Sequence, residues 1–156
     1  LILMTLRKGE ETLYIRHPIT QLGMAEAEEI ASIVRQADPE WWGETTAQRL
    51  AEGMHERLWL GIKANGKLVS IGGARLVDWG SVIGTIATHE AHRNKGYATS
   101  LVSALVKEIL QKSNLALIHV LSNNLPAIKV YEKVGFKPYR SYFLARATLT
   151  HPRRVI

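Results

Sequence analysis

The chain has no cysteine among its 156 residues, and it has no long apolar run. The lack of cysteine excludes a disulfide framework, a thiolate zinc site and a cysteine nucleophile. The lack of long apolar runs predicts that no helix spans a membrane. The N-terminal stretch LILMTLRKGEE has a brief apolar patch, but no basic region precedes it and no small-residue cleavage site follows it. We therefore expect no secretory signal peptide, and a cytoplasmic location follows by default.

The composition is that of a globular protein, with 46% hydrophobic and 22% charged residues. The length suits one domain, and repeats, low-complexity segments and linkers are missing, so we expect a single domain over residues 1–156. Because the sequence begins at Leu1 rather than methionine, this domain is also compatible with the C-terminal part of a longer chain; Met4 is another candidate start.

The net charge of +6 indicates an anionic partner: a nucleic acid, an anionic surface or a phosphate-bearing cofactor. The cations are spread along the chain. Their densest group, at 140–154, mixes with aromatic residues and is interpreted as an exposed terminal strand and tail. Nucleic acid ranks last among the partners because a reader motif and a concentrated basic face are both missing.

Hydrophobic periodicity and turn signals predict the secondary structure. Expected strands span 1–8, 13–18, 59–76 (a hairpin around Asn65-Gly66), 81–88, 115–122 and 136–149, the last as one or two strands. Expected helices span 24–37, 45–58 with a capping box at Thr45 and Gln48, 96–112, and 126–135 closed by Gly135. The run at 115–122 is continuously apolar, which favours a strand buried on both faces. The order ββααβββαβαβ predicts an α/β (α+β) domain with mixed sheet pairing.

Two motifs are rejected. Gly61 to Leu68 has the spacing of a phosphate-binding P-loop, but Leu68 replaces the required Ser or Thr and a strand follows. His89 and His92 in HEAH are three residues apart, whereas the helical zinc motif needs four, so we expect no metal site.

The stretch HRNKGYATSLV joins a predicted strand to an amphipathic helix through Arg93-x-x-Gly96-x-Ala98. The first amides of a helix lack internal partners and lie at the positive end of its dipole. Gly96 permits a tight turn and a close ligand, while Arg93 and Lys95 add positive charge. Together these features favour a phosphate or pyrophosphate site. The alternative is that Gly96 only allows the backbone to turn into the helix and binds no ligand.

A second motif, NLPAIKVYEKVGF, follows the apolar strand at 115–122. With both motifs in this order, the chain resembles the GNAT superfamily of acetyl-CoA-dependent N-acetyltransferases. THEAHRNKGYATSLV is similar to the family's R/Q-x-x-G-x-G/A turn, and the second stretch to its Asn-x-x-Ala-x-x-x-Tyr-x-x-x-Gly-Phe. The resemblance covers about residues 58–143. It implies a mixed, mostly antiparallel central sheet with a parallel, splayed strand pair, flanked by helices.

The resemblance also implies roles for individual residues, with acetyl-CoA as co-substrate. The backbone at Ile86, Ala87 and Thr88 would bind the pantetheine arm, and Asn124 would contact this arm near the splay. The pyrophosphate would lie on the amides of Arg93, Asn94, Lys95, Gly96, Tyr97, Ala98 and Thr99. Tyr131 would be the general acid that protonates the departing thiolate, which a phenol of pKa near 10 can do. The alternative for Tyr131 is a core tyrosine.

The implied reaction is direct attack of a primary amine on the thioester within a ternary complex, which needs no enzyme nucleophile. The general base stays open between Glu90, His89, His92, His119 and water. The acceptor is unidentified; Trp41, Trp42, Glu44 and Trp59 are candidate wall residues, with the aromatic ones interpreted mainly as core. Two further hypotheses are a homodimer and a non-catalytic CoA-binding sensor or scaffold module of a larger protein.

Overall fold

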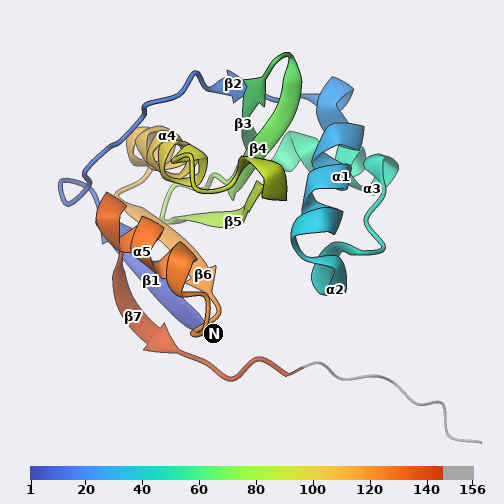
Figure 1. The fold of residues 1–156 in the computed structure, drawn as a ribbon. Helices are drawn as coiled ribbons and strands as arrows, with labels where there is room; N and C mark the ends of the chain where they lie inside the picture. Colours follow the sequence, from blue (N-terminus) through green and yellow to red (C-terminus); the bar gives the residue numbers. More distant parts are fainter. Residues whose placement is uncertain (146–156) are drawn as a thin grey trace, which may run out of the picture.

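The computed structural model describes residues 1–145 of the chain (Figure 1). Its strands are β1 (Ile2–Arg7), β2 (Thr20–Gln21), β3 (Leu58–Ala64), β4 (Lys67–Arg75), β5 (Ser81–Thr88), β6 (Leu115–Val120) and β7 (Lys137–Ser141). Its α-helices are α1 (Ala27–Ala37), α2 (Pro39–Trp42), α3 (Ala47–Gly53), α4 (Tyr97–Lys112) and α5 (Leu125–Val134), with 3-10 turns η1 (Met24–Glu26), η2 (Met54–Glu56) and η3 (Glu90–His92). None of the helices within 1–145 is long and apolar enough to cross a membrane.

The described strands form one sheet in the order β2-β3-β4-β5-β6-β1-β7. Neighbouring strands pair antiparallel except β5 and β6, which pair in parallel. This confirms the predicted mixed, mostly antiparallel sheet with one parallel pair. The chain reaches β6 from β5 through α4, as a parallel connection requires.

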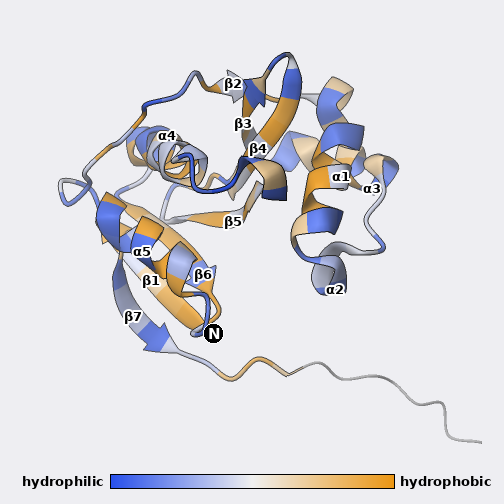
Figure 2. Ribbon diagram, viewed as in Figure 1, coloured by the Kyte–Doolittle hydropathy of each residue, from blue (hydrophilic) through white to orange (hydrophobic). Residues whose placement is uncertain are grey.

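Two apolar clusters lie on opposite faces of the sheet. α4 and α5 pack on one face, where Leu101, Leu105 and Phe136 are almost completely buried. On the other face α1 packs with Ile30 and Val34 against a cluster that includes Trp59, Ile71 and Ala87. In Figure 2 the apolar colours follow β1, β6 and the sheet-facing side of α1, whereas β7 is largely hydrophilic; the core thus lies between the sheet and its helices.

The turn signals in the sequence predict the local structure well. Asn65 and Gly66 have positive φ values of 51° and 77°, as a two-residue hairpin turn between β3 and β4 requires. Pro39 begins α2 after Asp38, whose side chain accepts a hydrogen bond from the amide of Trp41. Gly135, with φ of 116°, ends α5 in the left-handed conformation.

Four local predictions are wrong. Residues 13–18 form no strand, because their backbone bonds to α4 instead. The cap of α3 is Thr46, whose side chain accepts from the amide of Arg49, and not Thr45. The helix ends before Leu58, which begins β3 and pairs with Ala74. β6 alternates between buried and less buried residues, because helices cover only one of its faces. Residues 146–149 of the last predicted strand, and the basic residues beyond, lie outside the described part.

Candidate active site

The parallel strands β5 and β6 separate halfway along their length. Their pairing covers only three positions and ends at Ile83 opposite Ile118. The pairing between β4 and β5 shifts at the same level, since Gly73 faces Thr85 while Ala74 faces Ile83, so that Gly84 is an extra residue. A β-bulge of this kind bends its strand. The second half of β5 therefore has one edge that no described strand covers, as the predicted splay requires.

The backbone of this half of β5 alternates between β4 and the open edge. The carbonyl of Ala87 accepts from Ser70 Oγ of β4 at 3.2 Å, and the amide of His89 donates to Val69 O at 2.9 Å. Because successive residues of a strand point their amide and carbonyl groups to opposite sides, those of Ile86 and Thr88 face the open edge. Ile86 and Thr88 are two of the three positions predicted to bind the pantetheine arm. The third, Ala87, does not fit this prediction, because its backbone is turned to β4.

The chain then enters α4 through a strained turn. Asn94 and Gly96 have φ values of 62° and 80°, and Gly96 is the N-cap of the helix. The first described hydrogen bond into this helix runs from the amide of Ser100 to Gly96 O at 3.1 Å. Among the described residues, the amides at 94–99 have no acceptor, and Arg93 Nε donates to Thr88 O at 3.4 Å. Six successive amides without acceptors beside a cation make this turn a candidate anion site.

A segment that sequence reasoning missed supports this turn. Residues 13–17 run along α4, where Ser100 Oγ accepts from the amide of Arg16 at 3.1 Å and donates to Tyr14 O at 3.2 Å. At the end of this segment His17 Nε2 lies 2.9 Å from Lys95 O, and its ring meets the Tyr97 ring edge-on at 4.6 Å. The segment, called the strap below, therefore holds the turn from outside.

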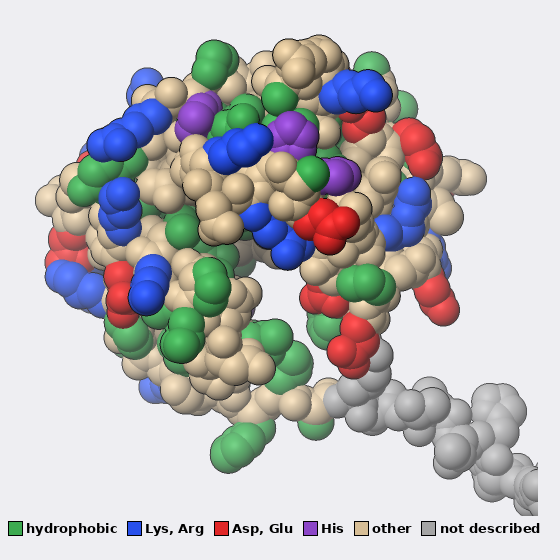
Figure 3. All heavy atoms as spheres, in the orientation of Figure 1, with side chains coloured by type: hydrophobic (Ala, Val, Ile, Leu, Met, Phe, Trp, Pro, Cys, Tyr) green, Lys and Arg blue, Asp and Glu red, His purple; other side chains and the backbone are tan. Residues whose placement is uncertain are grey.

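A cavity of about 270 Å³ occupies the gap between β5 and β6. It is lined from α1 and α2 by Val34, Ala37, Asp38 and Trp42, from β5 by Ile83, Gly84, Thr85, Ile86 and Ala87, and from β6 and α5 by Ile118, His119, Asn124 and Tyr131. Ile86 packs with the α4 cluster and Ala87 with the α1 cluster, so the cavity reaches both faces of the sheet. Figure 3 shows the surface hollowed between α5 and α2, with acidic side chains over α2.

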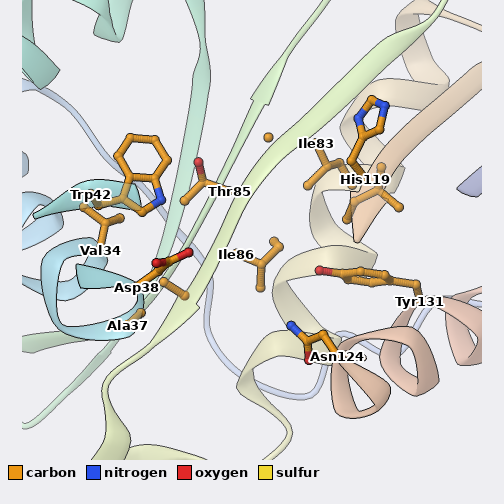
Figure 4. A pocket seen from close by; sticks show the side chains of 13 residues that line it. Val34, Ala37, Asp38, Trp42, Ile83, Thr85, Ile86, His119, Asn124 and Tyr131 are labelled. Carbon is orange, nitrogen blue, oxygen red and sulfur yellow. The ribbon is translucent and has the colours of Figure 1, made fainter. Parts of the chain in front are cut away.

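Tyr131 projects its hydroxyl group into this cavity from α5 (Figure 4). Its ring packs against Phe136 with centroids 6.2 Å apart, and only 7% of the residue is exposed. Burial raises the pKa of the phenol to about 12, since a phenolate is poorly solvated there. Tyr131 is thus a core residue and a cavity residue at once, and the pKa near 10 assumed from the sequence is too low.

The structure separates the candidate bases. Of the four named side chains, His119 alone lines the cavity, from β6. His89, Glu90 and His92 lie in and beside η3, past the end of β5, where His89 and His92 meet edge-on at 5.8 Å. Asn124 lines the cavity and also caps α5, because its Oδ1 accepts from the amide of Ala127 at 3.3 Å.

The wall opposite Tyr131 comes from α1, α2 and β5. Of the four wall candidates, Trp42 lines this cavity, whereas Trp59 is 3% exposed and belongs to the core below α1. Trp41 is 60% exposed and lines a second cavity of about 610 Å³ that also reaches Asp38. Glu44, just beyond α2, lines neither cavity. Sequence reasoning did not single out Asp38 as a site residue.

It also missed Thr85, which lies within an apolar strand and lines the cavity. Thr85 is 7% exposed, and its Oγ1 has no hydrogen-bond partner in the described structure. The sequence feature that could have drawn attention to Asp38 is its position at the start of a helix. The sequence offers no feature that identifies Thr85 as a cavity residue.

The separated parallel strands, the cavity between them and the amides without acceptors at the start of α4 together make up the candidate active site. The sequence model of the acetyltransferase (GNAT) family matches residues 27–136, and the chain belongs to this family. Membership confirms the family predicted from the two motifs and supports acetyl-CoA as co-substrate. No curated protein matches the chain.

Solved structures share the fold. An acetyltransferase of the GNAT family from Novosphingobium aromaticivorans has a TM-score of 0.74 at 19% identity, over 89% of this chain and 60% of its own. The ribosomal-protein-alanine N-acetyltransferase of Brucella melitensis has 0.67 at 18%, over 84% and 99%. The enzyme AAC(6')-Iy, solved with a CoA-containing bisubstrate analogue, has 0.68 at 17%, over 85% and 98%. The chain thus spans 60% of the first relative's length.

Proposed function

We propose that the protein is an N-acetyltransferase that moves the acetyl group of acetyl-CoA to a primary amine by direct attack in a ternary complex. The observation that carries this proposal is the cavity in the split between β5 and β6, which is lined from both faces of the sheet. Donor and acceptor can therefore approach from opposite faces and meet at the reacting carbonyl. No covalent enzyme intermediate is needed.

The donor occupies the α4 face and the open edge of β5. The free amides at 94–99 bind the pyrophosphate, with Arg93 and Lys95 as nearby positive charges. The amide and carbonyl groups of Ile86 and Thr88 bind the pantetheine arm as an added strand would. The thioester then lies in the gap near Asn124 and Tyr131, which both line the cavity.

The chemistry begins with a neutral amine, since an ammonium ion has no lone pair to attack with. The amine nitrogen bonds to the carbonyl carbon, and an amide on the open edge of β5 stabilises the resulting oxyanion. The C–S bond then breaks, and the Tyr131 hydroxyl group donates a hydrogen bond to the departing sulfur. The proton that the ammonium first lost leaves through water, for which His119 is the nearest of the predicted bases by position.

The raised pKa of Tyr131 changes how its role is understood. A phenol of pKa about 12 is a weaker acid than most thiols, so full proton transfer to a thiolate is uphill. Tyr131 therefore acts mainly as a hydrogen-bond donor to the negative charge that develops on sulfur. It stays protonated, and able to donate, throughout the neutral and moderately alkaline range.

The proposal is tested by binding and turnover together. Calorimetric titration should show binding of acetyl-CoA and desulfo-CoA but not of ATP, because the pantetheine arm is recognised as well as the phosphates. Turnover is read by a thiol reagent on incubation with an amine library. Since the chain has no cysteine, every thiol detected belongs to released CoA. Binding without thiol release from any amine would favour the CoA sensor or scaffold instead, and no binding would contradict both.

A further inference from the structure

The acceptor wall of the cavity has one negative charge and one unused hydroxyl group. Asp38 is the only carboxylate among the residues that line the cavity, and no lysine or arginine lines it. Thr85 Oγ1 is buried beside it without a partner in the described structure. In Figure 4 the side chains of Asp38, Thr85 and Trp42 lie together, on the side away from Tyr131. A buried unpaired hydroxyl is costly, so a partner from the cavity, either a water or a ligand atom, would stabilise it.

A cation lies beside this wall, at Arg57, which is exposed and is not one of the residues that line the cavity. Arg57 Nη1 is 3.0 Å from the place where a Cβ on Gly84 would be, so the guanidinium packs over the bulge where β5 opens. Arg57 immediately precedes β3 and shares the face of Trp59, two residues on, which belongs to the α1 side. Among the described residues its guanidinium has no ion pair or hydrogen bond. Asp38 has no ion pair there either, so the two opposite charges are not joined to each other.

We propose that this wall selects an acceptor in which the reacting amine has a carboxylate beside it, the simplest case being a free α-amino acid. This inference rests on the proposed acetyltransferase function and deepens it. Asp38 attracts the ammonium group, Thr85 Oγ1 accepts an N–H of the neutral amine, and Arg57 binds the carboxylate in the bidentate geometry that guanidinium favours. A diamine is disfavoured as an acceptor, because its second positive charge would lie near the positive charge of Arg57.

The atoms balance in this scheme. The ammonium group of the amino acid gives one proton to solvent, and the neutral nitrogen forms the N–C bond to the acetyl carbon. As the C–S bond breaks, the Tyr131 hydroxyl group donates a hydrogen bond to the departing sulfur and keeps its own proton, and the second proton passes from the nitrogen to the sulfur. The products are an N-acetyl amino acid, CoA as thiol and one released proton.

The first test compares acceptors that differ only at the carboxylate. With saturating acetyl-CoA, thiol release is measured for the pooled twenty amino acids, for the pool of their amides and for the pool of their decarboxylated amines. We expect kcat/KM to be at least about tenfold higher for the amino acids, given the 1.4 kcal/mol that a tenfold ratio represents. Equal or faster turnover of the amides, the decarboxylated amines or polyamines would overturn the inference and leave the proposed function standing. Thiol release from no amine at all would overturn both.

The second test uses variants. Arg57→Leu should remove the preference for amino acids over amides while acetyl-CoA affinity stays unchanged; Arg49→Leu, an exposed arginine on α3, is the matched control. Asp38→Asn keeps a good helix cap and should raise the KM for the acceptor about tenfold. Thr85→Val is nearly isosteric and should raise the melting temperature while lowering turnover, a combination that a purely structural threonine would not give. An undiminished preference in Arg57→Leu would contradict the role of this residue.

Discussion

The two sides of the split sheet differ in the chemical groups that they offer to a ligand: backbone groups on one side and side chains on the other. On the proposed donor side the ligand-binding groups are mostly backbone amides, concentrated in one short turn from residue 94 to 99 and one strand edge. On the proposed acceptor side they are side chains from three separate places in the chain: Asp38, Arg57 and Thr85. A site made of backbone leaves a compact local pattern in the sequence, whereas a site made of scattered side chains does not. Sequence reasoning can therefore propose the donor side, whereas the acceptor side needs the structure.

The largest effect is expected from breaking the donor side at its glycine. Gly96→Val puts a β-branched residue at φ of 80°, a backbone conformation that such residues rarely adopt, so the turn must change its shape. Losing two amide–phosphate hydrogen bonds, each worth roughly 1.5–3 kcal/mol, should weaken acetyl-CoA binding by at least about 100-fold. Calorimetry measures this.

Gly66→Val provides the matched control for that substitution. Gly66 also has positive φ, at 77°, but lies in the β3–β4 hairpin with nothing near its Cβ position. We expect similar destabilisation and unchanged acetyl-CoA affinity. Tight binding by Gly96→Val would mean that the pyrophosphate does not lie on this turn.

The next effect separates chemistry from binding within the cavity. Tyr131→Phe keeps the packing against Phe136 and removes only the hydroxyl group. We expect kcat to fall about 100-fold, the lower range for a group that assists proton transfer, with acetyl-CoA affinity within about twofold. Steady-state kinetics and calorimetry give the two numbers, and Tyr139→Phe on the exposed strand β7 is the control. An unchanged kcat would remove Tyr131 from the mechanism.

The sequence predicts the donor side and most of the fold because their determinants are local. Asn65-Gly66, Pro39 and Gly135 fix turns and helix ends by backbone preference alone, and periodicity gives the strands around the split. The strap at 13–17 was predicted as a strand because nothing nearby reveals that Ser100, 84 positions from Arg16, supplies its partner. The position of Thr85 could not be predicted for the same reason. Threonine is common in strands, and only the bulge at Gly84 turns this residue into the cavity.

A smaller effect should come from the strap. Ser100 is 1% exposed, and its hydroxyl group serves Arg16 N and Tyr14 O at once. Ser100→Ala should reduce the free energy of unfolding by about 1–3 kcal/mol, because both backbone groups lose their partner. Acetyl-CoA affinity should fall a few-fold, since the strap holds the turn through His17. Ser32→Ala on the exposed face of α1 should change neither by much. Loss of stability with full affinity would show that the donor turn is rigid without the strap.

The smallest effect is expected from the contacts of Glu26, which join the start of α1 to strand β3. Glu26, just before α1, accepts from the amide of Gly23 at 2.9 Å and pairs with Lys63 of β3 at 3.3 Å, and these contacts lower its pKa, the backbone bond first. A carboxyl group whose pKa is lower when folded stabilises the protein above its unfolded pKa, near 4.5, and loses this contribution as the pH falls through the folded value. Glu26→Gln should therefore be less stable than the natural chain at pH 7, with the difference shrinking below about pH 4. Urea unfolding at both pH values measures this, and a difference that grows on acidification would contradict the assigned contacts.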